Sequence, residues 1–324
     1  MPEPAASDPP PLDCVIVGAG PAGLTAATYL ARFLRRVLVV DAGASRARWI
    51  PTSHNCPGFP FGVTGPALLG KLREQAEGYG AAIVPGRIGR LQRVDEGFLA
   101  TAEDGQRWHA RHVLLATGIV DRMPPVEGLE AAIKAGAVRL CAVCDGYEAS
   151  DERIAVYAPI DQAIRHAAFL RTFSRRVAVL PTAPDAPSAC CAEIARNAHL
   201  ELLPVPRNLH HDARGCHARF DDGRCEWFDT LYPVLGGDAQ SQLALALGAE
   251  VDQTQELLVD DKLQTSVDGL YAIGDIVSAL NQISVAVGHA AIAATAIHQR
   301  LPPNYREDAA RQADRAAELP TPGD

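Results

Sequence analysis

DCVIVGAGPAGLTAATYLARFLRRVLVVD, residues 13–41, is the stretch that decides the fold of this chain. It opens with an apolar run, Cys14 to Val17, and passes through a glycine-rich turn into a helical stretch. A second apolar run, Val37 to Val40, then ends on Asp41. This order predicts a strand, a helix and a parallel strand, which is the unit that binds dinucleotides.

Three glycines, Gly18, Gly20 and Gly23, have the spacing of a pyrophosphate-binding turn. Gly18 makes the tight turn, Gly20 lets backbone N–H groups approach the pyrophosphate, and Gly23 lets helix and strand pack closely. Asp41 is placed to accept hydrogen bonds from ribose hydroxyls. An ordinary α/β unit with a glycine-rich turn is the alternative. The position of Asp41 at the end of the second strand favours dinucleotide binding.

A pair of cysteines, Cys141 and Cys144, is followed at once by Asp145 and Gly146. Two thiols three positions apart can form a reducible disulfide, and the neighbouring carboxylate can move the protons that thiol exchange requires. A zinc site and a chance pair of core cysteines are the alternatives. No second CxxC or HxxxH has zinc-site spacing, so we predict a redox centre and no metal.

Size and charge limit the remaining possibilities. A chain of 324 residues with 48% hydrophobic content fits two globular domains. The net charge of −9 argues against nucleic-acid and anionic-membrane surfaces. Eight mostly scattered cysteines and the lack of a signal-peptide pattern favour a reducing compartment, so we expect a cytoplasmic protein.

Further motifs give the chain a family resemblance. They are Asn55-Cys56-Pro57-Gly58-Phe59-Pro60, Ala116-Thr117-Gly118, the CxxCDG motif, Gly274-Asp275 and Asn281-Gln282-Ile283-Ser284. Together they resemble the low-molecular-weight thioredoxin reductases, which are two-domain flavoproteins and form homodimers. The resemblance implies an α/β fold with two Rossmann-like nucleotide-binding domains, the first of which holds FAD.

The resemblance also implies domain boundaries and cofactor contacts. A discontinuous FAD domain is expected at residues 1–120 and 234–324, and a degenerate NADPH-type domain that carries the CxxC motif at residues 121–233. Asp275 would bind near the ribityl-phosphate region, and the helix beginning near Gln282 would aim its N–H groups at the flavin pyrimidine. Family members usually carry Arg where Asn281 stands. The predicted cofactor residues are Gly18, Gly20, Gly23, Asp41, Asn55, Ala116, Thr117, Gly118, Gly274, Asp275, Gln282 and Ile283.

The second nucleotide-binding unit lacks the residues that hold phosphate. Where the family has a glycine-rich loop, this chain has Ala158-Pro159-Ile160, followed by a predicted helix from Ile164 to Phe173. Proline removes an N–H donor and isoleucine adds a branched side chain. Residues 181–187 contain no cation where the family has a basic cluster. We therefore expect that NADPH is not used through this site.

A flavin beside a dithiol, without NADPH, predicts an FAD-dependent dithiol oxidase. The resemblance implies that Cys141 exchanges with the substrate, Cys144 lies against the flavin and Asp145 transfers protons. The substrate is expected to be a small-molecule or peptide dithiol, and molecular oxygen the acceptor, giving hydrogen peroxide. Such oxidases form the disulfides of holomycin, gliotoxin and romidepsin, and the romidepsin type is the most similar because it lacks a usable nicotinamide site.

Two other functions stay open. One is a disulfide reductase fed by ferredoxin, which would need a basic docking patch such as Arg32, Arg35 and Arg36, or, less favoured, by NADPH. The other is a non-catalytic redox sensor. For His289 and Cys56 we favour packing roles over chemistry, and we interpret Cys190-Cys191 as incidental.

Overall fold

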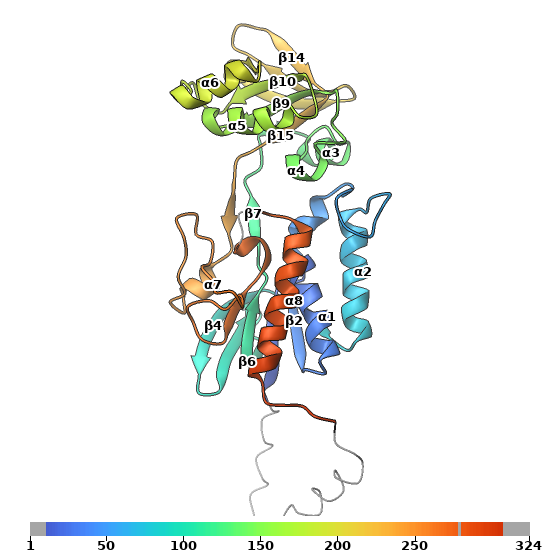
Figure 1. The fold of residues 1–324 in the computed structure, drawn as a ribbon, viewed down its shortest axis with the longest axis vertical. Coiled ribbons are helices and arrows are strands. Elements are labelled where there is room, and N and C mark those ends of the chain that lie inside the picture. Colours follow the sequence, from blue (N-terminus) through green and yellow to red (C-terminus); the bar gives the residue numbers. More distant parts are fainter. Residues whose placement is uncertain (1–10, 278–279, 307–324) are drawn as a thin grey trace, which may run out of the picture.

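The computed structural model describes residues 11–277 and 280–306. Within these ranges the chain forms two lobes joined by a narrow connection (Figure 1). The connection is an antiparallel ribbon of β7 (Ile119–Asp121) and β16 (Gly237–Ala239). We call the lobe before β7 and after β16 the first lobe, and the part between these strands the second lobe. The predicted α/β class with Rossmann-like parallel sheets is confirmed.

The first lobe is built on a seven-stranded sheet in the order β3-β2-β1-β6-β5-β4, with β17 also paired to β6. The central strand β1 runs parallel to β2 and β6, and its residues Cys14, Val15 and Ile16 have no exposed surface. Strands covered on both faces consist of apolar runs without alternation, as here. The strands are β1 (Leu12–Val17), β2 (Val37–Asp41), β3 (Ala82–Pro85), β4 (Ile88–Val94), β5 (Gly97–Ala102), β6 (Arg107–Leu115) and β17 (Leu270–Ala272).

Helices α1 and α8 pack side by side against one face of this sheet, with α2 beside α1 (Figure 1). Small buried residues such as Ala26, Ala290 and Ala293 allow the two helices to approach closely. Among the described helices, none is both long and apolar enough to cross a membrane. The helical elements of this lobe are α1 (Pro21–Arg32), η1 (Arg46–Trp49), α2 (Gly65–Gly78), α7 (Gln242–Leu245), η2 (Gly274–Ile276) and α8 (Ile283–Arg300).

The second lobe contains a parallel sheet, β11-β10-β9-β15, and a second sheet, β14-β13-β12-β8. Its helices are α3 (Leu129–Lys134), α4 (Ala142–Asp145), α5 (Ile160–Leu170) and α6 (Ala189–Asn197). Its strands are β8 (Val126–Glu127), β9 (Arg153–Ala158), β10 (Arg176–Pro181), β11 (Glu201–Leu202), β12 (Asn208–Asp212), β13 (Gly215–Arg219), β14 (Cys225–Phe228) and β15 (Thr230–Pro233).

One predicted boundary in this lobe is wrong. The helix expected from Ile164 to Phe173 begins at Ile160 and ends at Leu170. Pro159 is its N-cap, with φ of −50°, so the helix starts one residue after the strand ends. Proline is compatible with a helix start because its fixed φ is near the helical value and its missing N–H would be unpaired there. This junction therefore has one residue between strand and helix, whereas the β1–α1 turn has three, residues 18–20.

Candidate redox site

Cys141 and Cys144 are joined by a disulfide, with an S–S distance of 2.03 Å and a Cα–Cα distance of 5.3 Å. Cys141 is the N-cap of α4 and Cys144 lies within this helix, at the side of the second lobe that faces the first (Figure 1), and both cysteines are half-buried. In the described ranges, no group of three or more His, Cys, Asp or Glu side chains is placed to hold a metal ion. The described part of the chain therefore has one dithiol centre.

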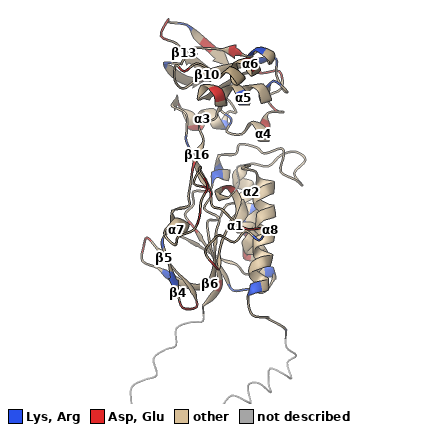
Figure 2. Cartoon of the chain, turned by 60° about the vertical axis from the view of Figure 1, so that its left-hand side comes forward, with Lys and Arg blue, Asp and Glu red and all other residues tan. Residues whose placement is uncertain are grey.

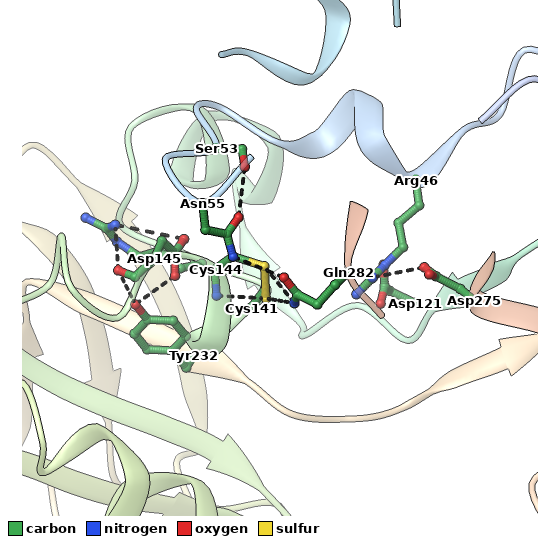
Figure 3. The surroundings of a disulfide bond; sticks show 11 residues. Arg46, Ser53, Asn55, Asp121, Cys141, Cys144, Asp145, Tyr232, Asp275 and Gln282 are labelled. Carbon is green, nitrogen blue, oxygen red and sulfur yellow. Dashed lines mark hydrogen bonds and ion pairs between the residues drawn. A yellow bond between two sulfur atoms is a disulfide. The ribbon is translucent and has the colours of Figure 1, made fainter. Parts of the chain in front are cut away.

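A row of side chains from the first lobe reaches the disulfide (Figure 3). The Gln282 side-chain Nε2 donates to both sulfurs, at 3.4 Å from Cys141 Sγ and 3.3 Å from Cys144 Sγ. Gln282 Oε1 in turn accepts from Asn55 Nδ2 at 3.0 Å, and Asn55 Oδ1 accepts from Ser53 Oγ at 3.1 Å. Because the amide of Gln282 is fixed in this orientation, N–H donors face the sulfurs.

Asp145 lies directly after the disulfide and is held by residues of the second lobe. The Tyr232 hydroxyl is 3.0 Å from its Oδ1, and Arg139 Nη1 is 3.9 Å from its Oδ2. Burial raises the pKa of Asp145 to about 6, an effect that the charge of Arg139 and the Tyr232 hydrogen bond partly offset. A carboxyl group with this pKa changes protonation close to neutral pH, as proton transfer between thiols requires.

The predicted cofactor residues come together around one cavity of about 700 Å³, which the disulfide and Asp145 also line. Gly23 alone does not line it. A Cβ on Gly23 would lie 1.9 Å from the Gly18 carbonyl oxygen, so this glycine permits helix and strand to touch. The predicted residues that line the cavity are Gly18, Gly20, Asp41, Asn55, Ala116, Thr117, Gly118, Gly274, Asp275, Gln282 and Ile283.

The walls of this cavity fit FAD. The N-cap of α1, Gly20, and the N-cap of α8, Gln282, make no side-chain capping bond, so the first N–H groups of both helices remain available for an anion or a flavin edge. Gly18 has φ of +108°, and a Cβ there would lie 2.4 Å from the Ala116 carbonyl oxygen. Gly18, Gly20 and Asp41 would hold the dinucleotide, and Gln282 and Ile283 would lie at the flavin.

Asp275, which a motif predicts, is ion-paired in the cavity wall with Arg46, which no sequence motif predicts. Arg46 Nε is 2.6 Å from Asp121 Oδ2, and Arg46 Nη1 is 3.3 Å from Asp275 Oδ2 (Figure 3). Burial alone would lower the pKa of Arg46, but the two carboxylates raise it, and burial raises the pKa of Asp275. Because Asp121 belongs to β7, the ribbon between the lobes is bound directly to the cofactor cavity.

The corresponding junction of the second lobe, between β9 and α5, is built differently. Asp161 lies in the first turn of α5, where its Oδ1 accepts from the Ser188 backbone N–H at 2.9 Å. Hydrogen bonds from the Ser188 side chain and from its backbone lower the pKa of Asp161, so the carboxylate stays charged at neutral pH. A negative charge at a helix N-terminus opposes the binding of phosphate there.

Several side chains with possible chemical roles are engaged elsewhere. Cys56 is buried with Val63 and Leu68, and this burial raises the pKa of its thiol. His289 Nδ1 accepts from the Gly274 backbone N–H at 3.3 Å, and burial lowers its pKa. The favoured packing and hydrogen-bonding roles of these two residues agree with these contacts. Cys190 and Cys191 are both free thiols.

Of the three cations suggested as a basic docking patch, Arg32 and Arg36 are exposed and Arg35 is buried. Arg35 is 8% exposed, and its guanidinium donates to His298 Nδ1 at 2.9 Å and to the Pro302 carbonyl at 2.9 Å. It anchors the end of α8 and cannot serve as a surface cation. In the view of Figure 2, segments coloured for acidic and for basic residues occur in both lobes.

Comparisons with known proteins agree with this architecture. A family model described as pyridine nucleotide-disulphide oxidoreductase matches residues 12–290. The chain is 33% identical over 282 residues to the thioredoxin reductase of Mycolicibacterium smegmatis, which covers 82% of this chain and 88% of that protein. The crystal structure of HlmI aligns with a TM-score of 0.84 at 26% identity over 95% of both chains. Thioredoxin reductase from Streptococcus pyogenes MGAS5005 aligns with a TM-score of 0.82 at 26% identity, over 89% of this chain and 97% of that one.

Proposed function

The chain belongs to the pyridine nucleotide-disulphide oxidoreductase family as a thioredoxin reductase-like flavoprotein, and we propose that it is an FAD-dependent dithiol oxidase. The net reaction would convert a small-molecule or peptide dithiol and molecular oxygen into a disulfide and hydrogen peroxide. Two electrons and two protons pass from substrate to oxygen, so the reaction balances without NADPH.

The β9–α5 junction carries this proposal. In place of a glycine-rich loop, Pro159 is the single residue between strand and helix, and Asp161 puts a carboxylate at the helix N-terminus. The first lobe, in contrast, keeps its glycines and its cavity. These features favour FAD over NADPH as the nucleotide that the chain uses.

The disulfide and its neighbours are suited to oxidise a dithiol. A substrate thiolate would attack Cys141 Sγ, which breaks the bond between the cysteines and releases Cys144 as a thiolate. The second substrate thiolate would then attack the sulfur of the substrate bound to Cys141, which releases the substrate disulfide and leaves both cysteines reduced. Bound FAD supplies the path by which the two electrons leave the dithiol for oxygen.

Two groups assist these exchanges. Gln282 Nε2 faces both sulfurs, so its N–H groups stabilise negative charge on whichever sulfur leaves. Asp145, with its pKa raised to about 6, accepts a proton from a thiol in its ionised form and returns it in its protonated form. Both groups keep their roles if electrons flow in the opposite direction, so they define the chemistry and not its direction.

Anaerobic mixing experiments test the direction. The purified holoprotein is mixed first with excess NADPH and then, separately, with dithiothreitol, while flavin absorbance is followed. We expect bleaching by the dithiol alone, recovery in air, and one hydrogen peroxide per disulfide formed.

Fast bleaching by NADPH would contradict the proposal, and bleaching only by reduced ferredoxin would identify a ferredoxin-fed reductase. Cys144→Ser is expected to abolish bleaching by the dithiol. Cys190→Ser, which removes an exposed free thiol outside the site, is the control and should bleach normally.

A further inference from the structure

Tyr232 is a large polar side chain buried in the second lobe with its hydroxyl at the redox site. It lies on β15, is 1% exposed, and pairs in register with Val156 of β9. Its hydroxyl is 3.0 Å from Asp145 Oδ1 and 3.2 Å from the Asp145 backbone oxygen. Burial raises the pKa of Tyr232 far above neutral pH, so the hydroxyl remains a hydrogen-bond donor.

The charged side chains around Asp145 lie farther from its carboxylate than the Tyr232 hydroxyl does. Arg139 Nη1 is 3.9 Å from Asp145 Oδ2, and Arg139 Nη2 is 3.8 Å from Glu152 Oε1, so one guanidinium is shared between two carboxylates. Glu148 and Glu152 both act on Asp145 through their negative charge, which raises its pKa. Among the described residues, Tyr232 is the one whose side chain lies within hydrogen-bond distance of the Asp145 carboxylate.

We propose that Tyr232 is a positioning residue, which holds Asp145 Oδ1 so that Oδ2 is the oxygen that exchanges protons with the thiols. The inference rests on the proposed proton-transfer role of Asp145. A donor at Oδ1 fixes the carboxyl rotamer and stabilises the ionised form, while the donor paired with Oδ2 among the described residues, Arg139 Nη1, is 3.9 Å away and beyond hydrogen-bond distance. The second lobe, whose nucleotide-binding junction has lost its glycines, therefore contributes to thiol chemistry through β15.

Tyr232→Phe tests this assignment because phenylalanine preserves the buried ring. Tyr271 on β17 is equally buried at 1% exposed and lies in the first lobe, so Tyr271→Phe is the matched control. The rate of flavin bleaching by dithiothreitol is measured anaerobically between pH 5 and 9 for both holoproteins. Loss of the hydrogen bond removes a stabilising contact of the ionised carboxyl, so the rising limb should move to higher pH. The rate at pH 6 should fall about fivefold or more, with little change at pH 9.

A second readout separates positioning from folding. Difference infrared spectroscopy, with Asp145→Asn used to assign the carboxyl band, should show the Asp145 titration moved to higher pH in Tyr232→Phe and unchanged in Tyr271→Phe. The double variant Tyr232→Phe/Asp145→Asn should be no slower than Asp145→Asn alone, because Tyr232 acts through Asp145.

An unchanged Asp145 titration in Tyr232→Phe, an equal shift in Tyr271→Phe, or additive rate losses in the double variant would overturn the assignment. If the protein proves to be a reductase, the pH series is run with whichever donor bleaches the flavin, so the two proposals fail separately.

Discussion

The two strand-to-helix junctions of the molecule, β1–α1 and β9–α5, have the same topology and opposite chemistry. At β1–α1, Gly18 and Gly23 bring strand, turn and helix within contact distance, and the first turn of the helix carries no acidic residue. At β9–α5, Pro159 and the charged Asp161 occupy the corresponding start of the helix. A parallel βαβ unit therefore persists without the glycine turn, because apolar strand packing maintains the unit whatever residues form the turn.

Gly23→Ala would break the first junction and has the largest expected effect. The new Cβ would lie 1.9 Å from the Gly18 carbonyl oxygen, and a backbone clash cannot be relieved by a side-chain rotation. We expect loss of bound FAD and a decrease of about 3 kcal/mol in unfolding free energy. Flavin content after purification and urea denaturation measure these effects.

Gly70→Ala is the matched control, since Gly70 lies in α2 with no atom within 4 Å of the added Cβ. It should keep its flavin and gain slightly in stability. Pro159→Ala at the second junction should also keep its flavin, and flavin loss there would show that both junctions serve the cofactor.

Asp145→Asn tests whether the second lobe supplies the proton-transfer group. The ionised form is needed as a base, so we expect at least a hundredfold slower dithiol-driven bleaching and loss of the rate limb near pH 6. The same substitution should slow the reaction but increase the free energy of unfolding at neutral pH. Because burial raises the pKa of Asp145 from 3.8 to about 6, the folded protein binds a proton more tightly than the unfolded chain, and its stability falls as pH rises between these values.

The asparagine variant should therefore be more stable than the original protein at pH 7, by on the order of 2 kcal/mol, and no more stable at pH 3. Thermal melting across this pH range measures the difference. A uniform destabilisation at every pH would contradict the burial effect on this carboxyl group.

Gln282→Leu asks how much the first lobe contributes to the chemistry of the disulfide in the second. The substitution removes the N–H donors that face both sulfurs. Without a hydrogen bond to the sulfur that becomes negatively charged, thiol exchange is expected to be about tenfold slower. The rate of bleaching by dithiothreitol measures this effect. Asn55→Ala leaves the Gln282 amide in place but removes its partner, so its effect should be smaller. Equal rates for Gln282→Leu and the original protein would show that the sulfurs do not use this donor.

Asp161→Asn has the smallest expected effect and sharpens the interpretation of the second junction. Removing a negative charge from the first turn of α5 should improve binding of adenosine 2′,5′-bisphosphate by less than about 1 kcal/mol, since no glycine turn forms there. Isothermal titration calorimetry measures it. Asp185→Asn, which changes the net charge equally in the exposed segment after β10, is the control. A gain of NADPH-driven bleaching in Asp161→Asn would show that a single charge, and not the turn, excludes the nucleotide.

The local sequence determined the β1–α1 unit, the position of the disulfide, the start of α8 and the loss of the second glycine turn. Each of these depends on residues close together in the chain, such as the glycines of residues 18–23 or the cysteines three positions apart. The sequence places the start of α5 four residues late, because the residues around Pro159 do not show by themselves that the proline begins the helix.

Only the tertiary structure decided which side chains complete the site. Tyr232 meets Asp145 across 87 residues, Gln282 meets Cys144 across 138, and Arg46 meets Asp275 across 229. No spacing rule joins such pairs, because their approach depends on strand order and on how the two lobes face each other. The sequence alone thus identified the bond that reacts, while the fold determined the donors, the proton-transfer partner and the ion pair that surround it.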